Sequence, residues 1–260
     1  MNKRFLSRWF GVALILGMVG CSSQVQELRL VSYNIHHCAG ADGKVDLKRV
    51  ADVIAKERPD YVGLNEVDVK AKRSGNIDEA TELGRMLGLH ATFAESIPLQ
   101  GGSYGNAILS KEKPLSVLRI PLPGREPRTL LLCEFSDCWF GATHLSLQKM
   151  NRVTSAEIIR SEIAKKTAGK PVFITGDWNA KPDSKTVAAM RGFLKILSDE
   201  TRDTFNGFGK RKLDPVYCID YIAVDKASAE RIKVKESRVT PDAVTSDHNL
   251  VAVVVEMTAD

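Results

Sequence analysis

Residues 171–180 of the sequence read Pro171-Val172-Phe173-Ile174-Thr175-Gly176-Asp177-Trp178-Asn179-Ala180. The apolar and β-branched run opens with proline and closes with glycine, which is typical of a buried strand. Asp177 and Asn179 follow two positions apart, and side chains at this spacing point to the same side of an extended chain. These two polar groups therefore either share one target or form an Asx-type turn by bonding the nearby backbone.

Polar residues also stand at the ends of other predicted strands. Strand-like runs over 28–35, 61–64, 139–143, 218–224 and 250–255 carry or adjoin Asn34, Glu66, His144, Asp220 and the pair Asp247-His248. Ligand and catalytic residues of sheet proteins gather at strand ends. The repeat favours a shared site over an isolated turn at residues 177–179.

The rest of the chain mixes helices and strands. Apolar residues at helical spacing predict one helix that begins at Asp46, and others over about 77–87 and 148–167. Further strands are predicted over 91–95, 106–110, 115–120, 129–135 and 232–239. Hairpin-length connections among these strands favour a layered α/β or α+β domain over a purely parallel sheet.

The first twenty residues have the layout of a secretory signal. Three basic residues precede the apolar run 9–19, which is short for a membrane span. Met18-Val19-Gly20-Cys21 resembles a bacterial lipobox, in which the cysteine is acylated; a short buried helix is the alternative. We predict a lipoprotein signal peptide at 1–20, a tether at 21–27 and an exported domain at 28–260. Lipidated Cys21 would anchor this domain to the membrane, facing the periplasm or the cell surface.

Loss of the signal changes the charge of the protein. The whole chain has 37 Lys and Arg against 32 Asp and Glu, a net charge of +5. Without Lys3, Arg4 and Arg8 the balance is 34 to 32, or +2. So small an excess gives only weak support to a nucleic-acid partner. The 240 residues from Cys21 onward suit one large domain, which would bury roughly 70–75% of its unfolded surface.

The cysteines after Cys21 do not have the spacing of a zinc site. They are Cys38, Cys133, Cys138 and Cys218. In an oxidising compartment four thiols allow three complete pairings, which sequence alone does not distinguish. We predict ordinary core cysteines or one disulfide.

The polar groups at the strand ends favour a particular chemistry. Carboxylates and amides without a thiolate form a hard oxygen site that suits Mg²⁺ or Mn²⁺. Two histidines add proton transfer near neutral pH. A cation, a carboxylate base and an imidazole together are the parts needed for attack of water on a phosphate ester.

Seven short motifs strengthen this interpretation. They are Tyr33-Asn34-Ile35-His36, Leu64-Asn65-Glu66-Val67, Tyr104-Gly105-Asn106-Ala107-Ile108-Leu109-Ser110, Thr143-His144-Leu145, Gly176-Asp177-Trp178-Asn179, Ile219-Asp220-Tyr221-Ile222 and Ser246-Asp247-His248-Asn249. In this order they resemble the endonuclease/exonuclease/phosphatase superfamily over nearly the whole mature domain. The resemblance implies an α+β fold, a four-layer α/β/β/α sandwich in which two mixed β-sheets pack face to face with helices outside.

The resemblance also implies roles for individual residues. Glu66 corresponds to the principal metal ligand, with Asn34 and Asp247 beside the metal. Asp177 would orient or deprotonate the attacking water, and Asn179 would hold a phosphate oxygen.

His248 paired with Asp220 would act on the phosphate or serve as the base, and sequence leaves open whether Asp177 or His248 takes the proton. His144 makes the chain more similar to the deoxyribonuclease, sphingomyelinase and inositol polyphosphate phosphatase branches than to the abasic-site endonucleases. Candidate substrate contacts are Tyr104, Asn106 and Arg128.

Two positions depart from the family pattern. Asn65 stands where glutamine is usual, and Cys218 stands where many relatives carry a basic residue. His36 and His37 lie close to Asn34 in sequence and could contact the substrate, although such a contact is not the preferred interpretation. The cluster Lys210-Arg211-Lys212 is interpreted as a solvated loop.

The expected protein is thus a monomeric, Mg²⁺- or Mn²⁺-dependent hydrolase of phosphate esters, most simply a phosphodiesterase. Its substrate stays open between nucleic acid, a phospholipid headgroup and a sugar phosphate. One alternative is a periplasmic or surface nuclease acting on DNA or RNA. Another is a non-catalytic lipoprotein that captures a phosphorylated ligand, although the metal Glu, the Asp-x-Asn pair and the Asp-His pair are all intact.

Overall fold

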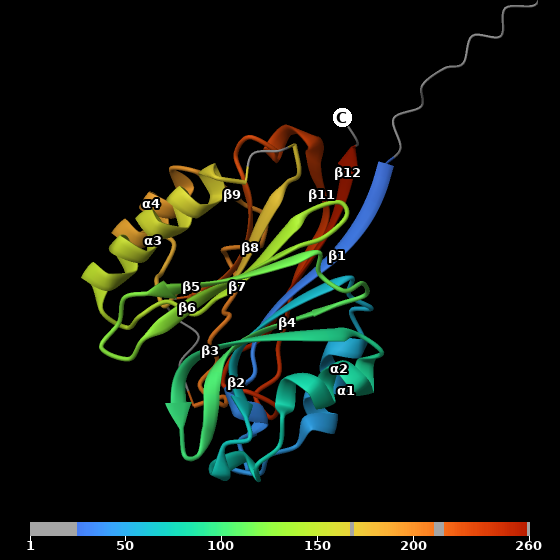
Figure 1. Cartoon of the computed structure of the whole chain (residues 1–260), viewed down its shortest axis with the longest axis vertical. Helices are drawn as coiled ribbons and strands as arrows, with labels where there is room; N and C mark the ends of the chain where they lie inside the picture. Colours follow the sequence, from blue (N-terminus) through green and yellow to red (C-terminus); the bar gives the residue numbers. More distant parts are fainter. Residues whose placement is uncertain (1–24, 167–168, 211–215, 259–260) are drawn as a thin grey trace, which may run out of the picture.

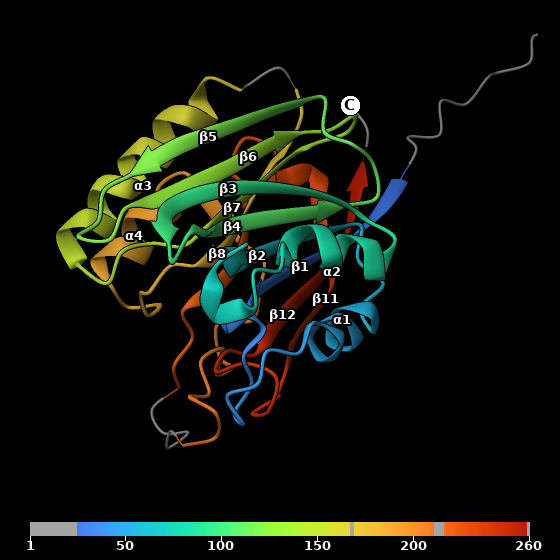
Figure 2. The same cartoon turned by 60° about the horizontal axis from the view of Figure 1, so that its bottom comes forward.

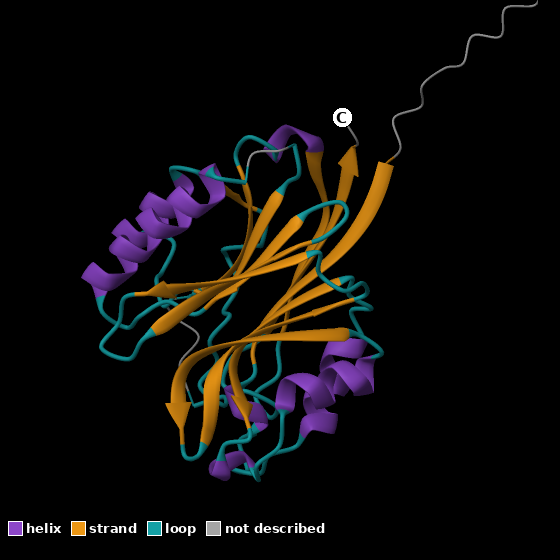
Figure 3. Ribbon diagram, in the orientation of Figure 1, coloured by secondary structure: helices purple, strands orange, loops and turns teal. Residues whose placement is uncertain are grey.

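The computed structural model describes residues 25–166, 169–210 and 216–258. The predicted signal peptide, Cys21 and Arg211-Lys212 lie outside the described residues. Two six-stranded sheets pack face to face, and helices cover their outer faces (Figures 1 and 3). The predicted four-layer sandwich is confirmed.

The first sheet has the strand order β11-β12-β1-β2-β4-β3. Its strands are β1 (Val25–Asn34), β2 (Tyr61–Val69), β3 (His90–Leu99), β4 (Gly102–Ser110), β11 (Ile232–Thr240) and β12 (Leu250–Thr258). β1 and β2 are parallel, and the other neighbours are antiparallel. Helices α1 (Leu47–Ala55) and α2 (Glu79–Leu87) cover its outer face (Figure 2).

The second sheet has the order β5-β6-β7-β8-β10-β9. Its strands are β5 (Ser116–Leu122), β6 (Arg128–Glu134), β7 (Trp139–Thr143), β8 (Val172–Asp177), β9 (Leu194–Ile196) and β10 (Asp220–Asp225). Here β7 and β8 form the parallel pair. Helices α3 (Lys149–Ala164) and α4 (Lys185–Arg191) cover the face opposite to the first sheet (Figure 2).

Three apolar cores separate the four layers. The central core lies between the sheets and contains Phe140, Phe173 and Val253, all fully buried. Two flanking cores lie between each sheet and its helices. Burying one such side chain contributes about 1.5–3 kcal/mol, so the inward-facing residues of both sheets hold the strand ends in fixed relative positions.

Helix starts follow capping residues in the sequence. Asp46 accepts a hydrogen bond from the backbone N–H of Arg49 at 3.0 Å, and so caps α1 as predicted. Asp78 accepts from the N–H of Thr81 at 3.0 Å. This cap places the start of α2 at Glu79, two residues later than the apolar pattern suggests.

Strand ends differ from the sequence prediction where a partner strand supplies backbone hydrogen bonds. β1 begins at Val25 rather than at Leu28, because Val25 pairs with Thr258 of β12. β2 continues beyond Leu64 to Val69, because β4 remains its partner on the far side of a bulge. Polar side chains in both extensions interrupt the apolar pattern, so the pattern did not predict the full length of either strand.

The four described cysteines, Cys38, Cys133, Cys138 and Cys218, are free and buried, as expected of core cysteines. Burial raises the pKa of each thiol, to about 12 for Cys133 and Cys218, which keeps the thiols protonated and unreactive. Among the described residues, none of the helices combines the length and apolar character needed to cross a bilayer.

Candidate active site

The two parallel strand pairs end at the same place in the sandwich. Asn34 is the last residue of β1 and Asp177 the last of β8, and their side chains lie 3.4 Å apart (Nδ2 to Oδ2). Gly176 makes this approach possible: its φ is +134°, and a Cβ there would lie 1.8 Å from the carbonyl oxygen of Thr143. The glycine that closes the predicted strand is therefore required by the contact between β7 and β8.

Glu66 owes its position to a bulge in β2. The pairing of β2 with β4 shifts register between Leu64 and Val67, and Glu66 has a left-handed φ of +59°. Such bulges redirect a side chain and are common beside active sites. The half-buried Glu66 carboxylate accepts a hydrogen bond from Nδ2 of Asn34 at 3.0 Å.

Asn34 lies at the centre of the cluster. Its Nδ2 lies within hydrogen-bonding distance of Glu66, of Asp177 and, at 3.4 Å, of Nε2 of His248. Its Oδ1 accepts from the backbone N–H of His36 at 3.1 Å, which fixes the amide orientation. An amide nitrogen has two hydrogens, and the carboxylates of Glu66 and Asp177 can accept them.

Asp177 and Asp220 are direct partners across the antiparallel strands β8 and β10. Like charges opposite each other are unfavourable, and His248 offsets the repulsion. Its Nδ1 lies 2.9 Å from Oδ2 of Asp220, and its Nε2 lies 3.7 Å from Oδ2 of Asp177. The triad is almost completely buried.

Burial and the charge of Asp220 raise the pKa of Asp177 to about 7. Burial alone would lower the pKa of His248, but Asp220 and Asp177 outweigh this and raise it to about 10. Around neutral pH His248 is therefore cationic and has no free lone pair to accept a proton, whereas Asp177 can act as a base.

His144 and Asn179 complete the second-sheet side of the cluster. Nε2 of His144 lies 3.0 Å from Nδ2 of Asn179 and 3.4 Å from Oδ2 of Asp177. Burial, with the charges of Arg128 and His248, lowers the pKa of His144 well below its usual range, so the imidazole is neutral. Asn179 has φ of +49°, and its backbone N–H donates to Asp177 at 2.7 Å. The Asx turn considered from sequence is thus present within the site itself.

The predicted substrate contacts lie beside this cluster. Arg128 is 7% exposed and pairs with Glu126 (Nη1 to Oε1, 2.6 Å), and Tyr104 interacts with the Arg128 side chain. Asn106 lies deeper: its amide donates to the carbonyl of Thr129 at 2.8 Å and accepts from Asn65. A substrate contact by Asn106 stays a prediction.

Asp247 is half-buried beside the cluster. Its carboxylate lies 3.5 Å from the hydroxyl of Ser246, and its carbonyl accepts backbone hydrogen bonds from Asn206 and Gly207. Among the described residues, the Asp247 carboxylate does not belong to either cluster of three possible metal ligands whose donor atoms lie within 4.8 Å of one another. Its role as a metal ligand stays a prediction.

Three residues hold the site residues in place: Asn65 and Ser246 belong to motifs found in the sequence, whereas Thr204 was missed by sequence reasoning. Asn65 accepts from the backbone N–H of Asp177 at 2.8 Å and donates to Asn106, so it joins the two sheets. Thr204 accepts from the N–H of Asp220 at 3.0 Å, and Ser246 donates to the carbonyl of Asn34 at 2.8 Å. In the sequence, Asn65 and Ser246 each precede an acidic residue of a motif, which could have drawn attention to them. Nothing in the sequence singles out Thr204.

The donor set fits a divalent cation. A carboxylate oxygen of Asp177 and one of Asp220 lie within 4.8 Å of each other, and Oδ1 of Asp220 is buried with no hydrogen-bond partner among the described residues. Glu66 adds a third carboxylate on the other side of Asn34. A buried excess of carboxylate oxygens is the environment that a hard cation stabilises.

Residues 31–248 match the Endonuclease/Exonuclease/phosphatase family. The chain belongs to this family. No curated protein is significantly similar to it in sequence. Family membership makes the chain a metal-dependent phosphoesterase, and the cluster at the strand ends is its candidate active site.

Solved structures of other family proteins share the fold. A family protein of Bacteroides vulgatus is 19% identical with a TM-score of 0.74, over 89% of this chain and 99% of that one. The mannosyl-6-phosphatase of Bacteroides thetaiotaomicron is 19% identical (TM-score 0.66; 88% and 99% covered). TDP2 of D. rerio, complexed with a single-stranded DNA product, is 18% identical (TM-score 0.66; 88% and 98% covered). At these identities the similarity shows the fold alone.

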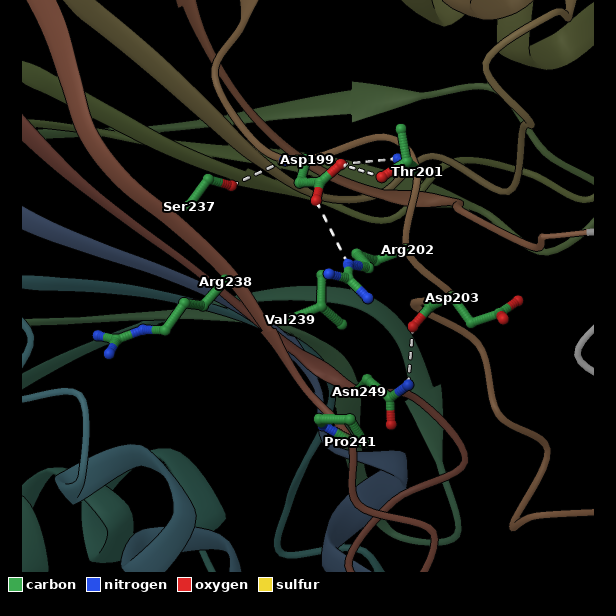
Figure 4. A pocket seen from close by; sticks show the side chains of 9 residues that line it. All are labelled: Asp199, Thr201, Arg202, Asp203, Ser237, Arg238, Val239, Pro241 and Asn249. Atoms are coloured by element: carbon green, nitrogen blue, oxygen red, sulfur yellow. Dashed lines mark hydrogen bonds and ion pairs between the residues drawn. The ribbon is translucent and has the colours of Figure 1, made fainter.

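A cavity of about 530 Å³ lies beside β11 and the loop that precedes β12 (Figure 4). Asn249 lines it and donates to the carbonyl of Asp203 at 2.7 Å. Its arginines are paired within the protein: Arg202 with Asp199, and Arg238 with Glu57 and Glu236. None of the residues that line this cavity belongs to the catalytic cluster.

Proposed function

We propose that this protein is a Mg²⁺- or Mn²⁺-dependent phosphodiesterase that uses Asp177 to activate water. The observation that carries the proposal is the position of the Asp177 carboxylate. It lies within 3.4 Å of both Asn34 and His144 and within 3.7 Å of His248, and it is almost fully buried. A base in such a dry, charged environment suits a catalytic task better than a structural one.

The chain's own residues divide the chemistry among them. Asp177 takes a proton from water, because His248 is held cationic by Asp220. His248 can then stabilise negative charge on a phosphoryl oxygen, and Asn179 can donate to another. Glu66 and Asn34, with Asp247, would hold the divalent cation, which offsets the negative charge of the phosphoryl group.

The position of the N-terminus bears on the substrate. Val25 and Asn34 are the two ends of β1, so the site lies roughly 30 Å along the strand from its start, at about 3.3 Å per residue. If Cys21 is lipidated, the anchor joins the domain at the end remote from the cleft. This arrangement favours a phosphate ester in solution, such as a nucleotide or sugar-phosphate diester, over a lipid in the anchoring bilayer.

The proposal is tested by hydrolysis of bis(p-nitrophenyl) phosphate, compared with p-nitrophenyl phosphate. We expect turnover with Mg²⁺ or Mn²⁺, none with EDTA, faster cleavage of the diester and loss of activity in Asp177→Ala. Asp183→Ala is the matched control, because Asp183 is exposed in the loop after β8. Faster cleavage of the monoester would contradict a phosphodiesterase and indicate a phosphatase. A panel of DNA, RNA, sphingomyelin and sugar phosphates would then define the substrate.

The non-catalytic alternative gives a different result. A folded protein that binds Mg²⁺ but cleaves no phosphate ester would support ligand capture and contradict the proposed hydrolysis. The proposed anchor is tested separately by palmitate labelling in a bacterial host. Labelling should depend on Cys21 and disappear in Cys21→Ala.

A further inference from the structure

A second cluster of possible metal ligands adjoins the catalytic cluster, and its two histidines have no role in the reaction described above. His36 and His37 form a short 3₁₀ turn (η1, His36–Cys38) directly after β1. One donor atom each from His36, His37 and Glu66 lies within 4.8 Å of the others. The three side chains also line a cavity of about 150 Å³, together with Arg73 and Tyr104.

The hydrogen bonding of His36 leaves one ring nitrogen available. Its Nδ1 lies 2.9 Å from the carbonyl oxygen of Ala39. Because a carbonyl oxygen only accepts, Nδ1 carries the proton and Nε2 keeps its lone pair. Metal-ligating histidines typically donate their other ring N–H to a backbone carbonyl in this manner, which fixes both the tautomer and the ring orientation.

His37 also has an uncommitted nitrogen. Its Nδ1 is buried and has no hydrogen-bond partner in the described part of the chain. A buried polar atom without a partner is energetically costly. The cost is relieved if Nδ1 coordinates a ligand in the adjoining cavity.

The backbone around this cluster is unusual. Three consecutive non-glycine residues, His36, His37 and Cys38, have φ of 45°, 42° and 54°, and Glu66 has φ of 59°. Left-handed backbone is unfavourable for non-glycine residues and persists where the surrounding structure enforces it, often at functional sites. Here it directs two neighbouring imidazoles toward the same carboxylate.

We propose that His36, His37 and Glu66 form a second cation site for a divalent first-row transition ion such as Zn²⁺, Co²⁺ or Mn²⁺. Two imidazoles and one carboxylate suit these ions, whereas Mg²⁺ prefers oxygen ligands. Glu66 belongs to this site and to the catalytic cluster, so the second cation lies beside the bound phosphate ester. Any effect on turnover rests on the proposed function, whereas binding of the cation does not.

The test uses Co²⁺ as the probe, because its visible absorption reports nitrogen coordination. The purified protein is freed of metal, saturated with Mg²⁺ and titrated with Co²⁺, with total metal measured in parallel. We expect one equivalent of Co²⁺ with new visible bands, and at least a tenfold loss of Co²⁺ affinity in His37→Ala. His90→Ala removes an exposed histidine on β3 and should leave the titration unchanged.

His37→Gln serves as a second variant that keeps side-chain volume and polarity, and circular dichroism checks that each variant is folded. Equal Co²⁺ affinity in the wild type and both His37 variants would overturn the proposal, as would the absence of nitrogen-ligated Co²⁺. Co²⁺ binding that depends on His37 in a protein without phosphoesterase activity would uphold this site and contradict the proposed function. Phosphoesterase activity in a protein that does not bind Co²⁺ through His37 would support the proposed function and contradict the second cation site.

Discussion

The two sheets contribute to the site through the same structural unit. In the first sheet, α1 connects the parallel strands β1 and β2, and Asn34 and Glu66 come from these strands. In the second sheet, α3 connects the parallel strands β7 and β8, and His144 and Asp177 stand at their ends. We call these the first unit and the second unit.

The units differ in how they hold their polar groups. In the first unit, Glu66 is half-buried and positioned by left-handed backbone in a bulge. In the second unit, His144 and Asp177 are almost fully buried and have strongly shifted pKa values. A half-buried carboxylate is open to an exchangeable cation, whereas a dry environment favours proton transfer. Under the proposed function, the same topology serves twice, once to bind the cation and once for acid–base chemistry.

The largest effect on turnover should come from the second unit. Asp177→Asn removes the base and should lower kcat roughly 10²- to 10⁴-fold, the range typical of general acid–base catalysis. The affinity for Mg²⁺ should change far less than kcat. Steady-state kinetics and calorimetric titration with Mg²⁺ measure the two quantities. Equal losses in both would break the proposed division between the units.

A smaller loss at saturating cation should come from the first unit. Loss of a residue that only hydrogen-bonds to a metal ligand typically lowers metal affinity roughly 10- to 100-fold. Because Glu66 would bind the cation directly, Glu66→Gln should lower Mg²⁺ affinity by more than this. Much of the activity should return at high Mg²⁺ concentration. Activity that stays lost at saturating Mg²⁺ would show that Glu66 takes part in the chemical step and does not only bind the cation.

A third substitution tests the contact between the units. Asn65→Ala removes the acceptor for the backbone N–H of Asp177 and the donor to Asn106. We expect roughly a tenfold fall in kcat with little change in KM, because misplacing a catalytic group costs rate more than binding. Asn151→Ala, a half-buried position in the first turn of α3, is the control. Unchanged kcat in Asn65→Ala would mean that β8 alone positions Asp177.

The smallest effect on turnover should come from Glu79, a fully buried acid behind the first unit whose carboxylate accepts from the N–H of Asp68. Burial, with a contribution from the charge of Asp68, raises its pKa from 4.5 to about 8. The native state therefore binds this proton more tightly than the unfolded state. The free energy of unfolding should fall as pH rises from about 4.5 to about 8.

Glu79→Gln should remove this pH dependence and stabilise the protein at pH 8 by a few kcal/mol, since one pKa unit corresponds to about 1.4 kcal/mol. Urea unfolding at pH 5 and pH 8 measures the change, and Glu82→Gln on the exposed side of α2 is the control. A Glu79→Gln variant that is less stable than the wild type at pH 8 would show that the ionised carboxylate is needed.

Much of the fold followed from local patterns. The capping residue Asp46 and the run that ends at Gly176 have local causes, and both were predicted. The bulge at Glu66 depends on the register of β4, and the short strand β9 depends on pairing with β10. Such elements are set by partners distant in sequence, so a single-sequence pattern does not reveal them.

The candidate site was predictable to a similar degree. The motif residues Asn34, Asp177 and His248 come together as expected of strand-end polar groups. The cationic state of His248 was not predictable, because it depends on the nearby carboxylates of Asp220 and Asp177, which outweigh the effect of burial. The proximity of His36 and His37 to Glu66 depends on three consecutive left-handed residues, which no sequence rule indicates for His-His-Cys.

The central claim is that the two units form one phosphoesterase site, and a double-mutant cycle tests it most directly. The cycle compares kcat/KM for bis(p-nitrophenyl) phosphate in the wild type, Glu66→Gln, Asp177→Asn and the double variant at fixed Mg²⁺. Substitutions of residues that act as a unit have strongly non-additive effects on catalysis. The kcat/KM of the double variant should therefore be only a little lower than that of Asp177→Asn, the less active of the two single variants. Losses that multiply fully would contradict a shared site.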